Sequence, residues 1–197
     1  IVFEGIEGSG KSYHIKNLSN YLKKKKIKFI KIREPGGSKN SEKIRRLLLK
    51  KNSKFHRFTD LLMYMASRNE NLHNILLQNH KKKIILIDRF IDSTIAYQHF
   101  GMRINLKIIK LINNFILKKI KPDYTFLNVV NKKNLKQRLK KRENLNRYDN
   151  FNFNFYSRVQ KGFLKLAKNK KKYLIVDSNL PTSTNKKIII NQLKKII

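Results

Sequence analysis

The segment Gly5-Ile6-Glu7-Gly8-Ser9-Gly10-Lys11-Ser12 determines how the rest of the sequence is interpreted. It matches the pattern G-x-x-x-x-G-K-[ST], follows an apolar stretch at residues 1–3, and opens a segment with helical spacing at residues 11–26. Chance would produce this pattern in a chain of this length about 1% of the time. Backbone N–H groups of such a glycine-rich turn, together with a helix N-terminus, bind phosphate groups. We therefore expect all eight residues to bind the phosphates of a nucleoside triphosphate.

A second apolar stretch, at residues 84–87, ends in Asp88 and Arg89. In folds built around a phosphate loop, a carboxylate at the end of a strand holds Mg²⁺ directly or through water, and the loop hydroxyl is a further ligand. We expect Ser12 and Asp88 to hold the ion, and Lys11 to reach the β- and γ-phosphate oxygens. The planar guanidinium of Arg89 suits bidentate binding of a phosphate. The alternative for Asp88 is a strand that simply ends in an acidic residue.

Apolar and helical stretches alternate along the chain. Stretches rich in β-branched residues predict strands at 1–3, 27–32, 84–87, 124–130 and 173–176. Segments with helical spacing lie at 11–26, 38–50, 58–79, 93–99, 105–118, 132–141, 151–169 and 182–195. This alternation predicts a three-layer α/β fold, in which a five-stranded parallel sheet has helices on both faces. We expect a single domain over residues 1–197, with ligands at the carboxyl ends of the strands.

The composition is strongly basic, with 47 Lys and Arg residues against 12 Asp and Glu residues and a net charge of +35. A charge of this size is typical of proteins that bind nucleic acid. The excess, however, is mostly Lys scattered through every segment, as at 23–26, 81–83 and 170–172. Solvated helix and loop faces explain this distribution equally well, so we expect no specific nucleic-acid partner.

The sequence has no Cys, which excludes disulfides and Cys-based metal sites. No apolar run reaches the roughly 20 residues that a membrane-spanning helix needs, and the N-terminus lacks the pattern of a secretory signal. We expect a soluble, cytoplasmic protein without a membrane partner. Because Ile1 already lies inside a predicted strand, we also expect a few residues to precede it.

Four further stretches indicate that the chain transfers a phosphoryl group from the nucleoside triphosphate, and they indicate which acceptor receives it. They are Arg33-Glu34-Pro35-Gly36-Gly37, the helical segment Leu62 to Arg68, the segment Asp88 to Gln98, and the basic loop Arg142 to Asp149. In this order and spacing they resemble bacterial thymidylate kinases, the family that phosphorylates dTMP with ATP, from Ile1 to about Asp177. The resemblance implies a P-loop kinase fold with a mobile lid near residues 142–149, Mg²⁺ as cofactor, and a homodimer formed through helices beside the sheet.

The resemblance also implies how the nucleoside of dTMP is held. Glu7 matches the acidic residue that contacts the sugar 3'-hydroxyl, which gives a reason for a carboxylate inside an anion-binding loop. Tyr64 falls where the family places an aromatic ring, usually Phe, that stacks on thymine. Arg68 falls where an Arg reaches a base carbonyl, and residues four apart share a helix face. Packing against its apolar neighbours on the helix is the alternative interpretation of Tyr64.

Further acceptor positions lie after the third predicted strand. Arg89 matches the arginine that binds the acceptor phosphate in the family. Thr94, Tyr97 and Gln98 match positions that line the nucleoside pocket, with the ring of Tyr97 against the sugar C2'. The same analogy places a cis peptide before Pro35, an arrangement that X-Pro bonds alone adopt at low cost.

The lid is expected to supply cations, because phosphoryl transfer requires neutralisation of charge. Some members of the family carry an Arg within the phosphate loop, where this chain has Ser9. We therefore expect Arg142 and Arg147 to act as catalytic cations, with Arg138 as a third candidate. The family usually has Asp where this chain has Asn146, which removes a carboxylate that would orient the neighbouring Arg.

Two alternatives stay open on the sequence alone. One is another P-loop nucleoside or nucleotide kinase with a different acceptor. The other is a binding protein whose basic surface holds nucleic acid and whose nucleotide site is regulatory. A comparison of acceptors distinguishes the first, and polyanion binding that survives physiological salt distinguishes the second.

Overall fold

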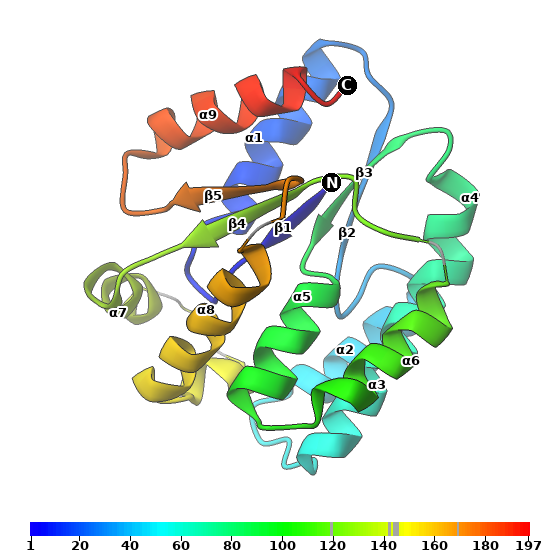
Figure 1. Ribbon diagram of the computed structural model, residues 1–197, viewed down its shortest axis with the longest axis vertical. Coiled ribbons are helices and arrows are strands. Elements are labelled where there is room, and N and C mark those ends of the chain that lie inside the picture. Colours follow the sequence, from blue (N-terminus) through cyan, green and yellow to red (C-terminus); the bar gives the residue numbers. More distant parts are fainter. Residues whose placement is uncertain (119, 142, 144–145, 169) are drawn as a thin grey trace.

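Five parallel strands form the centre of the fold, in the order β2-β3-β1-β4-β5 (Figure 1). The computed structural model describes residues 1–118, 120–141, 143, 146–168 and 170–197. The strands are β1 (Val2–Glu4), β2 (Phe29–Arg33), β3 (Ile84–Asp88), β4 (Thr125–Val129) and β5 (Tyr173–Asp177). The predicted five-stranded parallel sheet is confirmed, with strand ends shifted by one or two residues.

The helices follow the predicted segments closely. They are α1 (Lys11–Lys24), α2 (Lys39–Leu49), α3 (Arg57–Asn71), α4 (Leu77–Asn79), α5 (Ile91–Thr94), α6 (Leu106–Leu117), α7 (Lys132–Lys140), α8 (Phe153–Ala167) and α9 (Thr182–Lys194). Two π-helical segments, η1 (Leu72–Leu76) and η2 (Ile95–Gly101), continue α3 and α5, and a short 3-10 helix, η3 (Arg147–Asn150), precedes α8. The segment predicted as one helix at 58–79 is thus α3, η1 and α4 in succession.

The two faces of the sheet are covered by different helices (Figure 1). Successive side chains of a strand point to opposite faces, and buried strands are therefore apolar on both. Phe3, Leu86 and Phe126 pack toward α1 and α9 on one face. Val2 and Leu127 belong to the cores of the opposite face, which is covered by η1, η2, α6 and α8.

The strand order reverses beside β1, which lies between β3 and β4. Open α/β sheets bind ligands outside the carboxyl ends of the strands at such a point. Phe3 pairs with Asp88 in the register, so the segment after β1 and the segment after β3 emerge side by side. The fold thereby brings residues 5–12 next to residues 88–98.

Candidate active site

The phosphate loop connects β1 to α1, and two of its glycines are required by its shape. Gly5 has a φ of +135°, and a Cβ at this position would lie 2.3 Å from the carbonyl oxygen of Asn128. Gly10, directly before α1, has a φ of +90°, which residues with a Cβ rarely adopt. The loop therefore turns around the N-terminus of α1, where free N–H groups and the helix dipole favour phosphate.

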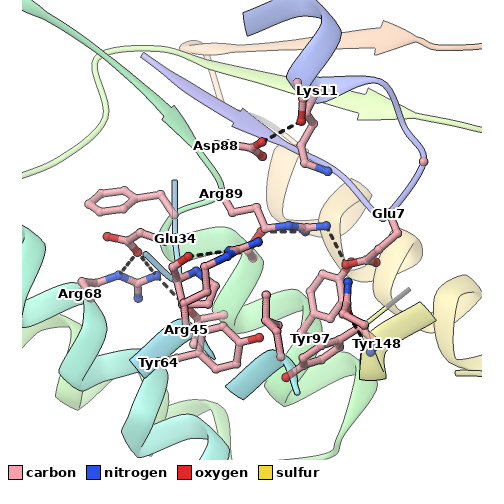
Figure 2. Close-up of a pocket in the computed structure, with 18 of the residues that line it drawn as sticks. Glu7, Lys11, Glu34, Arg45, Tyr64, Arg68, Asp88, Arg89, Tyr97 and Tyr148 are labelled. Carbon is pink, nitrogen blue, oxygen red and sulfur yellow. Dashed lines mark hydrogen bonds and ion pairs between the residues drawn. The ribbon is translucent and has the colours of Figure 1, made fainter. Parts of the chain in front are cut away.

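Lys11 is the first residue of α1, and its side chain folds back over the loop (Figure 2). Its Nζ donates hydrogen bonds to the carbonyl oxygens of Gly5 at 3.0 Å and Ile6 at 2.9 Å. Burial lowers the pKa of the ammonium group to about 8, and nearby Arg89 acts in the same direction. An anion bound in the loop would strongly stabilise the charged form of Lys11.

Ser12 and Asp88 contact each other across the carboxyl ends of β1 and β3. Oγ of Ser12 donates to Oδ2 of Asp88 at 3.1 Å, whereas Oδ1 of Asp88 is buried without a hydrogen-bond partner among the described residues. Proteins commonly bind Mg²⁺ through one or two carboxylates, with phosphate oxygens and waters completing the shell. The described residues contain no group of three or more His, Cys, Asp or Glu side chains arranged to hold a metal ion. The donor atoms present thus fit an ion that is shared with phosphates.

Arg89 and Glu7 form an ion pair beside the loop (Figure 2). Nη2 of Arg89 lies 2.8 Å from Oε1 of Glu7, and Nη1 donates to the carbonyl oxygen of Gly5 at 2.9 Å. The hydroxyl of Tyr97 donates to Oε2 of Glu7. Burial opposes ionisation of Glu7, but Arg89, Lys11 and the Tyr97 hydroxyl outweigh it, so the pKa of Glu7 is lowered. Specific partners thus hold an ionised carboxylate inside an anion-binding loop.

The loop, the Arg89–Glu7 pair and the helices α2, α3, α5 and η2 line a cavity of about 430 Å³. Most of the predicted site residues lie on its wall, namely Glu7, Gly8, Gly10, Lys11, Ser12, Tyr64, Arg68, Asp88, Arg89, Thr94, Tyr97 and Gln98. Three loop residues, Gly5, Ile6 and Ser9, are buried behind this wall. The residues predicted for the donor and for the acceptor therefore share one cavity.

Arg68 lies at the back of the cavity, where its guanidinium is fully paired. It donates to Glu34 at 2.8 Å, to Oδ1 of Asn113 at 2.5 Å and to Oγ1 of Thr94 at 3.0 Å, and the residue is 1% exposed. Burial raises the pKa of Glu34, and Arg68 counters this. The cluster joins α3, α5, α6 and the segment after β2. The predicted cis peptide before Pro35 is present next to it.

Several residues on the cavity wall were not predicted from the sequence as site residues, and Arg45 and Tyr148 are the two whose side chains matter most for the proposed chemistry. Arg45 extends from α2 and donates to the carbonyl oxygen of Pro35 at 2.6 Å, and its pKa is lowered by burial and by Arg33. The one signal for it is an Arg in a chain that uses mostly Lys. Glu34, also on the wall, was part of a quoted motif without an assigned role.

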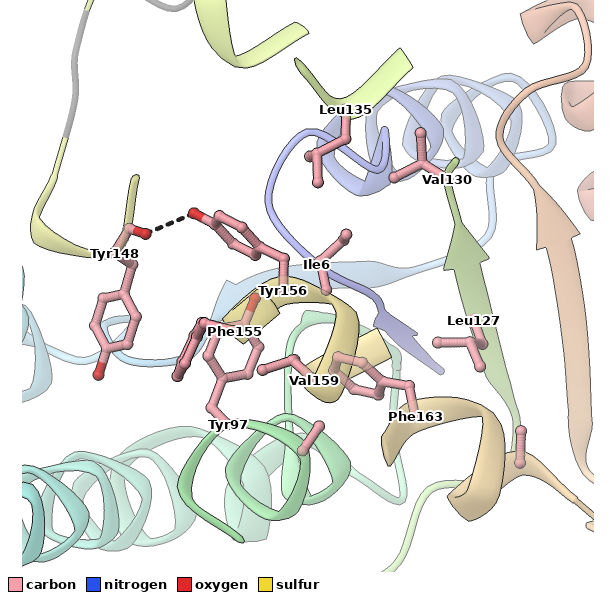
Figure 3. Packing of buried hydrophobic residues seen from close by; sticks show 12 residues of the cluster. Ile6, Tyr97, Leu127, Val130, Leu135, Tyr148, Phe155, Tyr156, Val159 and Phe163 are labelled. Atoms are coloured by element: carbon pink, nitrogen blue, oxygen red, sulfur yellow. Dashed lines mark hydrogen bonds between the residues drawn. The ribbon is translucent and has the colours of Figure 1, made fainter. Parts of the chain in front are cut away.

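Tyr148 and Tyr64 face each other across the cavity. Their rings meet edge to face at 6.3 Å between centroids. Tyr148 also meets Tyr97 edge to face at 5.8 Å, and its carbonyl oxygen accepts from the Tyr156 hydroxyl at 2.5 Å (Figure 3). Tyr64 is partly exposed on the cavity wall, not enclosed in the core. Its ring packs against Tyr148 of η3.

The predicted lid cations are placed differently from one another. Arg142 lies outside the described residues. Arg147 forms an ion pair with Asp60 of α3 and donates to the Tyr148 hydroxyl at 3.2 Å, so it lies off the cavity wall. Arg138 donates to the carbonyl oxygens of Gly8 at 2.9 Å and Ser178 at 2.6 Å. Oδ1 of Asn146 accepts from the backbone N–H of Tyr148 at 2.8 Å, which fixes the start of η3.

Among the described residues, no helix is both long and apolar enough to cross a membrane.

Comparisons with known proteins agree over nearly the whole chain. A family model described as thymidylate kinase matches residues 3–189. The thymidylate kinase of Sulfurihydrogenibium sp. (strain YO3AOP1) is 37% identical over 198 residues, covering 99% of this chain and 96% of that protein. That of Acholeplasma laidlawii (strain PG-8A) is 36% identical over 200 residues, covering 99% and 98%. A crystal structure of thymidylate kinase from Ehrlichia chaffeensis superposes with a TM-score of 0.79 at 30% identity, covering 98% and 96% of the two chains.

Proposed function

This chain belongs to the thymidylate kinase family, and from that premise we infer how its site carries out the reaction. It is an ATP-dependent dTMP kinase, which transfers the γ-phosphoryl group of ATP to dTMP and releases ADP and dTDP. One observation in the site supports this acceptor above others. Glu7, inside the phosphate loop, is held by Arg89 and Tyr97, and we propose that this single ionised carboxylate contacts the nucleoside beside the phosphates.

We propose that the eight loop residues and the N-terminus of α1 bind the phosphates of ATP. Lys11 exchanges its two carbonyl partners for phosphate oxygens, and the anionic partner stabilises its charged form. Ser12 and Asp88 would hold Mg²⁺, with Oδ1 of Asp88, which has no hydrogen-bond partner among the described residues, as a ligand atom. When bound, this ion neutralises charge on the phosphates of the donor.

The acceptor lies on the other side of Arg89. We propose that the guanidinium of Arg89 binds the phosphate of dTMP, with Arg45 as a second cation on the same wall. Tyr64 stacks on the base, Thr94 and Gln98 line the nucleoside pocket, and Tyr97 limits the space at C2'. Arg68 is paired with Glu34, so we assign it to the wall that holds the base edge.

Transfer then depends on position and on charge more than on covalent chemistry. An oxygen of the dTMP phosphate attacks the γ-phosphorus as the bond to the ADP oxygen breaks, and Lys11 and Arg89 stabilise the charge that spreads over the transferring group. We propose that Arg147 adds a third cation once it leaves Asp60, because η3 carries both Arg147 and the cavity residue Tyr148. Arg142 stays a proposed catalytic cation on sequence grounds alone.

A comparison of acceptors tests the function. Purified protein with ATP and Mg²⁺ is expected to form ADP fastest with dTMP among the common nucleoside monophosphates, and to lose the activity when EDTA removes the metal. The readout is coupled ADP formation at equal acceptor concentrations. A higher kcat/KM with another monophosphate would reassign the acceptor, and turnover in EDTA would exclude the role of Asp88 and Ser12.

We propose a homodimer through the outer face of α3 and α6. Ile108, Leu111 and Phe115 lie three and four residues apart on α6, so they share one helix face, and Phe115 is 82% exposed. Phe58 and Leu62 of α3, which packs against α6, are exposed as well. A patch of this kind commonly marks a protein interface. Since subunits of charge +35 repel each other, an apolar centre is required to hold them together.

Phe115→Glu is expected to convert the dimer to a monomer, because it places a carboxylate on this face at its most exposed apolar side chain. Sedimentation velocity at several protein concentrations gives the mass. The matched control is Ile188→Glu on α9, an exposed residue on the opposite side of the sheet, which is expected to stay dimeric. A wild-type protein that is monomeric at micromolar concentration, or a dimeric Phe115→Glu variant, would contradict the proposal.

A further inference from the structure

Glu4 is a carboxylate at the end of β1, immediately before the phosphate loop, and it is 1% exposed. Burial of an ionised carboxylate costs several kcal/mol unless strong partners compensate. Burial and the nearby charge of Asp92 raise the pKa of Glu4 to about 7, although hydrogen bonds from Ser93 and Phe90 oppose this. The partners of this carboxylate indicate what it holds in place.

The partners of Glu4 all belong to one segment, the turn that starts α5. Oε1 accepts from the backbone N–H groups of Phe90 at 2.9 Å and Ser93 at 3.1 Å, and Oε2 accepts from the Ser93 hydroxyl at 2.5 Å. These are donors at the N-terminus of α5, where the N-cap residue Phe90 has no side chain able to accept them. Glu4, which belongs to β1, thus caps the N-terminus of α5, the helix that follows β3 and continues into η2.

This turn determines where Arg89 points. Arg89 has a φ of +68°, a left-handed conformation that costs a residue with a Cβ roughly 1–2 kcal/mol. The turn is held on one side by the backbone bond from Arg89 to Phe3 at 2.9 Å and on the other by Glu4. Nη1 of Arg89 also lies 3.4 Å from the Ser93 hydroxyl that Glu4 binds. Glu4 therefore lies behind Arg89, linked to it through Ser93, and off the wall of the substrate cavity.

We propose that Glu4 is a positioning residue for the acceptor half of the site, fixing Arg89 and the start of α5 against the strand that carries the phosphate loop. This inference rests on the proposed function, because it assigns the acceptor phosphate to Arg89. Glu4 joins the two halves directly: its backbone leads into the loop that binds the donor, and its carboxylate holds the segment that binds the acceptor. A small displacement of Arg89 would misalign the acceptor oxygen, and errors near 1 Å reduce rates by up to about a hundredfold.

Glu4→Gln is the informative substitution, because it keeps the size of the side chain and one acceptor oxygen. At an assay pH above 7, where the Glu4 carboxylate is ionised, it replaces charge-assisted hydrogen bonds by neutral ones, which are about half as strong. We expect kcat/KM for dTMP to fall about tenfold or more, shared between kcat and KM, with KM for ATP within about twofold of wild type. Glu4→Asp keeps the charge but is one methylene shorter, and it is expected to show the same selective loss.

The matched control is Asp92→Asn, which also neutralises a largely buried carboxylate at the start of α5. Asp92 binds Lys170 and Tyr173, away from the substrate cavity. Removing its charge lowers the pKa of Glu4 and so leaves Glu4 ionised, and we therefore expect Asp92→Asn to alter the melting temperature but neither KM. Ser93→Ala, which removes one hydrogen bond and keeps the charge of Glu4, is a milder second test if Glu4→Gln folds poorly; it is expected to raise KM for dTMP severalfold.

The experiment is steady-state kinetics with each substrate varied, alongside thermal unfolding of every variant. A wild-type protein inactive toward dTMP would refute the proposed function and not this inference. A folded Glu4→Gln variant with wild-type kinetics, or one in which KM for ATP and KM for dTMP rise equally, would overturn the positioning role. So would Asp92→Asn kinetics indistinguishable from those of Glu4→Gln.

Discussion

Replacing Lys11 by Ala is expected to lower kcat by about a thousandfold or more. Lys11 is the one residue of the phosphate loop whose side chain is a cation, and its ammonium lies over the loop carbonyls of Gly5 and Ile6. Removal leaves charge on the transferring phosphoryl group without its nearest protein partner. Because burial lowers the pKa of Lys11, its charged form is held at a cost, and the variant is expected to keep its fold. Coupled ADP assays and thermal unfolding measure the two quantities.

Lys16→Ala is the matched control. Lys16 is exposed on the same helix, and we expect this variant to have wild-type activity.

Arg147→Ala gives a second loss of kcat with which the loss in Lys11→Ala can be compared. If Arg147 joins the site only after it leaves Asp60, its loss is expected to lower kcat less than loss of Lys11, by about ten- to a hundredfold. Activity of the Lys11 variant within tenfold of wild type would refute the assignment of the loop, and unchanged kcat in Arg147→Ala would remove Arg147 from the catalytic residues.

Arg89→Asn is expected to reduce kcat/KM for dTMP by about a thousandfold. Asn tolerates the positive φ of this position better than other residues with a Cβ, so the backbone turn is kept while the guanidinium is lost. We expect the loss in kcat and in KM for dTMP more than in KM for ATP. Arg89 contacts Glu7 and Gly5, at the part of the loop that we assign to the acceptor. Initial rates with dTMP varied at saturating ATP report it.

Measurements of stability distinguish the two roles proposed for Arg89, binding of the acceptor phosphate and pairing with Glu7. Without the guanidinium, the Glu7 carboxylate is buried without its partner, which destabilises the fold by about 3 kcal/mol. Adding Glu7→Gln to Arg89→Asn is expected to restore the melting temperature and not the activity. Arg33→Asn is the control, since its ion pair with Glu42 is exposed and contributes little. Recovery of activity in the double variant would show that Arg89 acts only by holding Glu7.

The sheet and the phosphate loop could be predicted because their signals are local. Residues 84–88 contain the apolar run and the terminal carboxylate within five positions, and the phosphate-loop pattern is complete within eight consecutive residues. Arg89 followed from Asp88, because the chain leaves a parallel strand at the edge where ligands bind. Each of these features depends on neighbours in the sequence.

The features of the site that could not be predicted from the sequence depend on contacts between distant segments. Arg147 and Asp60 are 87 positions apart, and nothing in the basic segment around Arg147 indicates that it would face α3. Arg45 lies on a helix with other cations, so only the packing of α2 shows that it faces the cavity. The same holds for Tyr148, whose partners Tyr64 and Tyr97 come from two other helices. Such pairings are set by the tertiary fold.

Four of the 12 acidic residues, Glu4, Glu7, Glu34 and Asp88, lie at or just beyond the carboxyl ends of β1, β2 and β3. Each has a defined partner there, whereas the 47 basic residues are spread along the chain. If the proposed roles hold, a few carboxylates and the arginines they bind determine the specificity, and most of the lysines take no part in it. We then expect the number of lysines on the exposed helices to change with genome composition at little cost to the reaction.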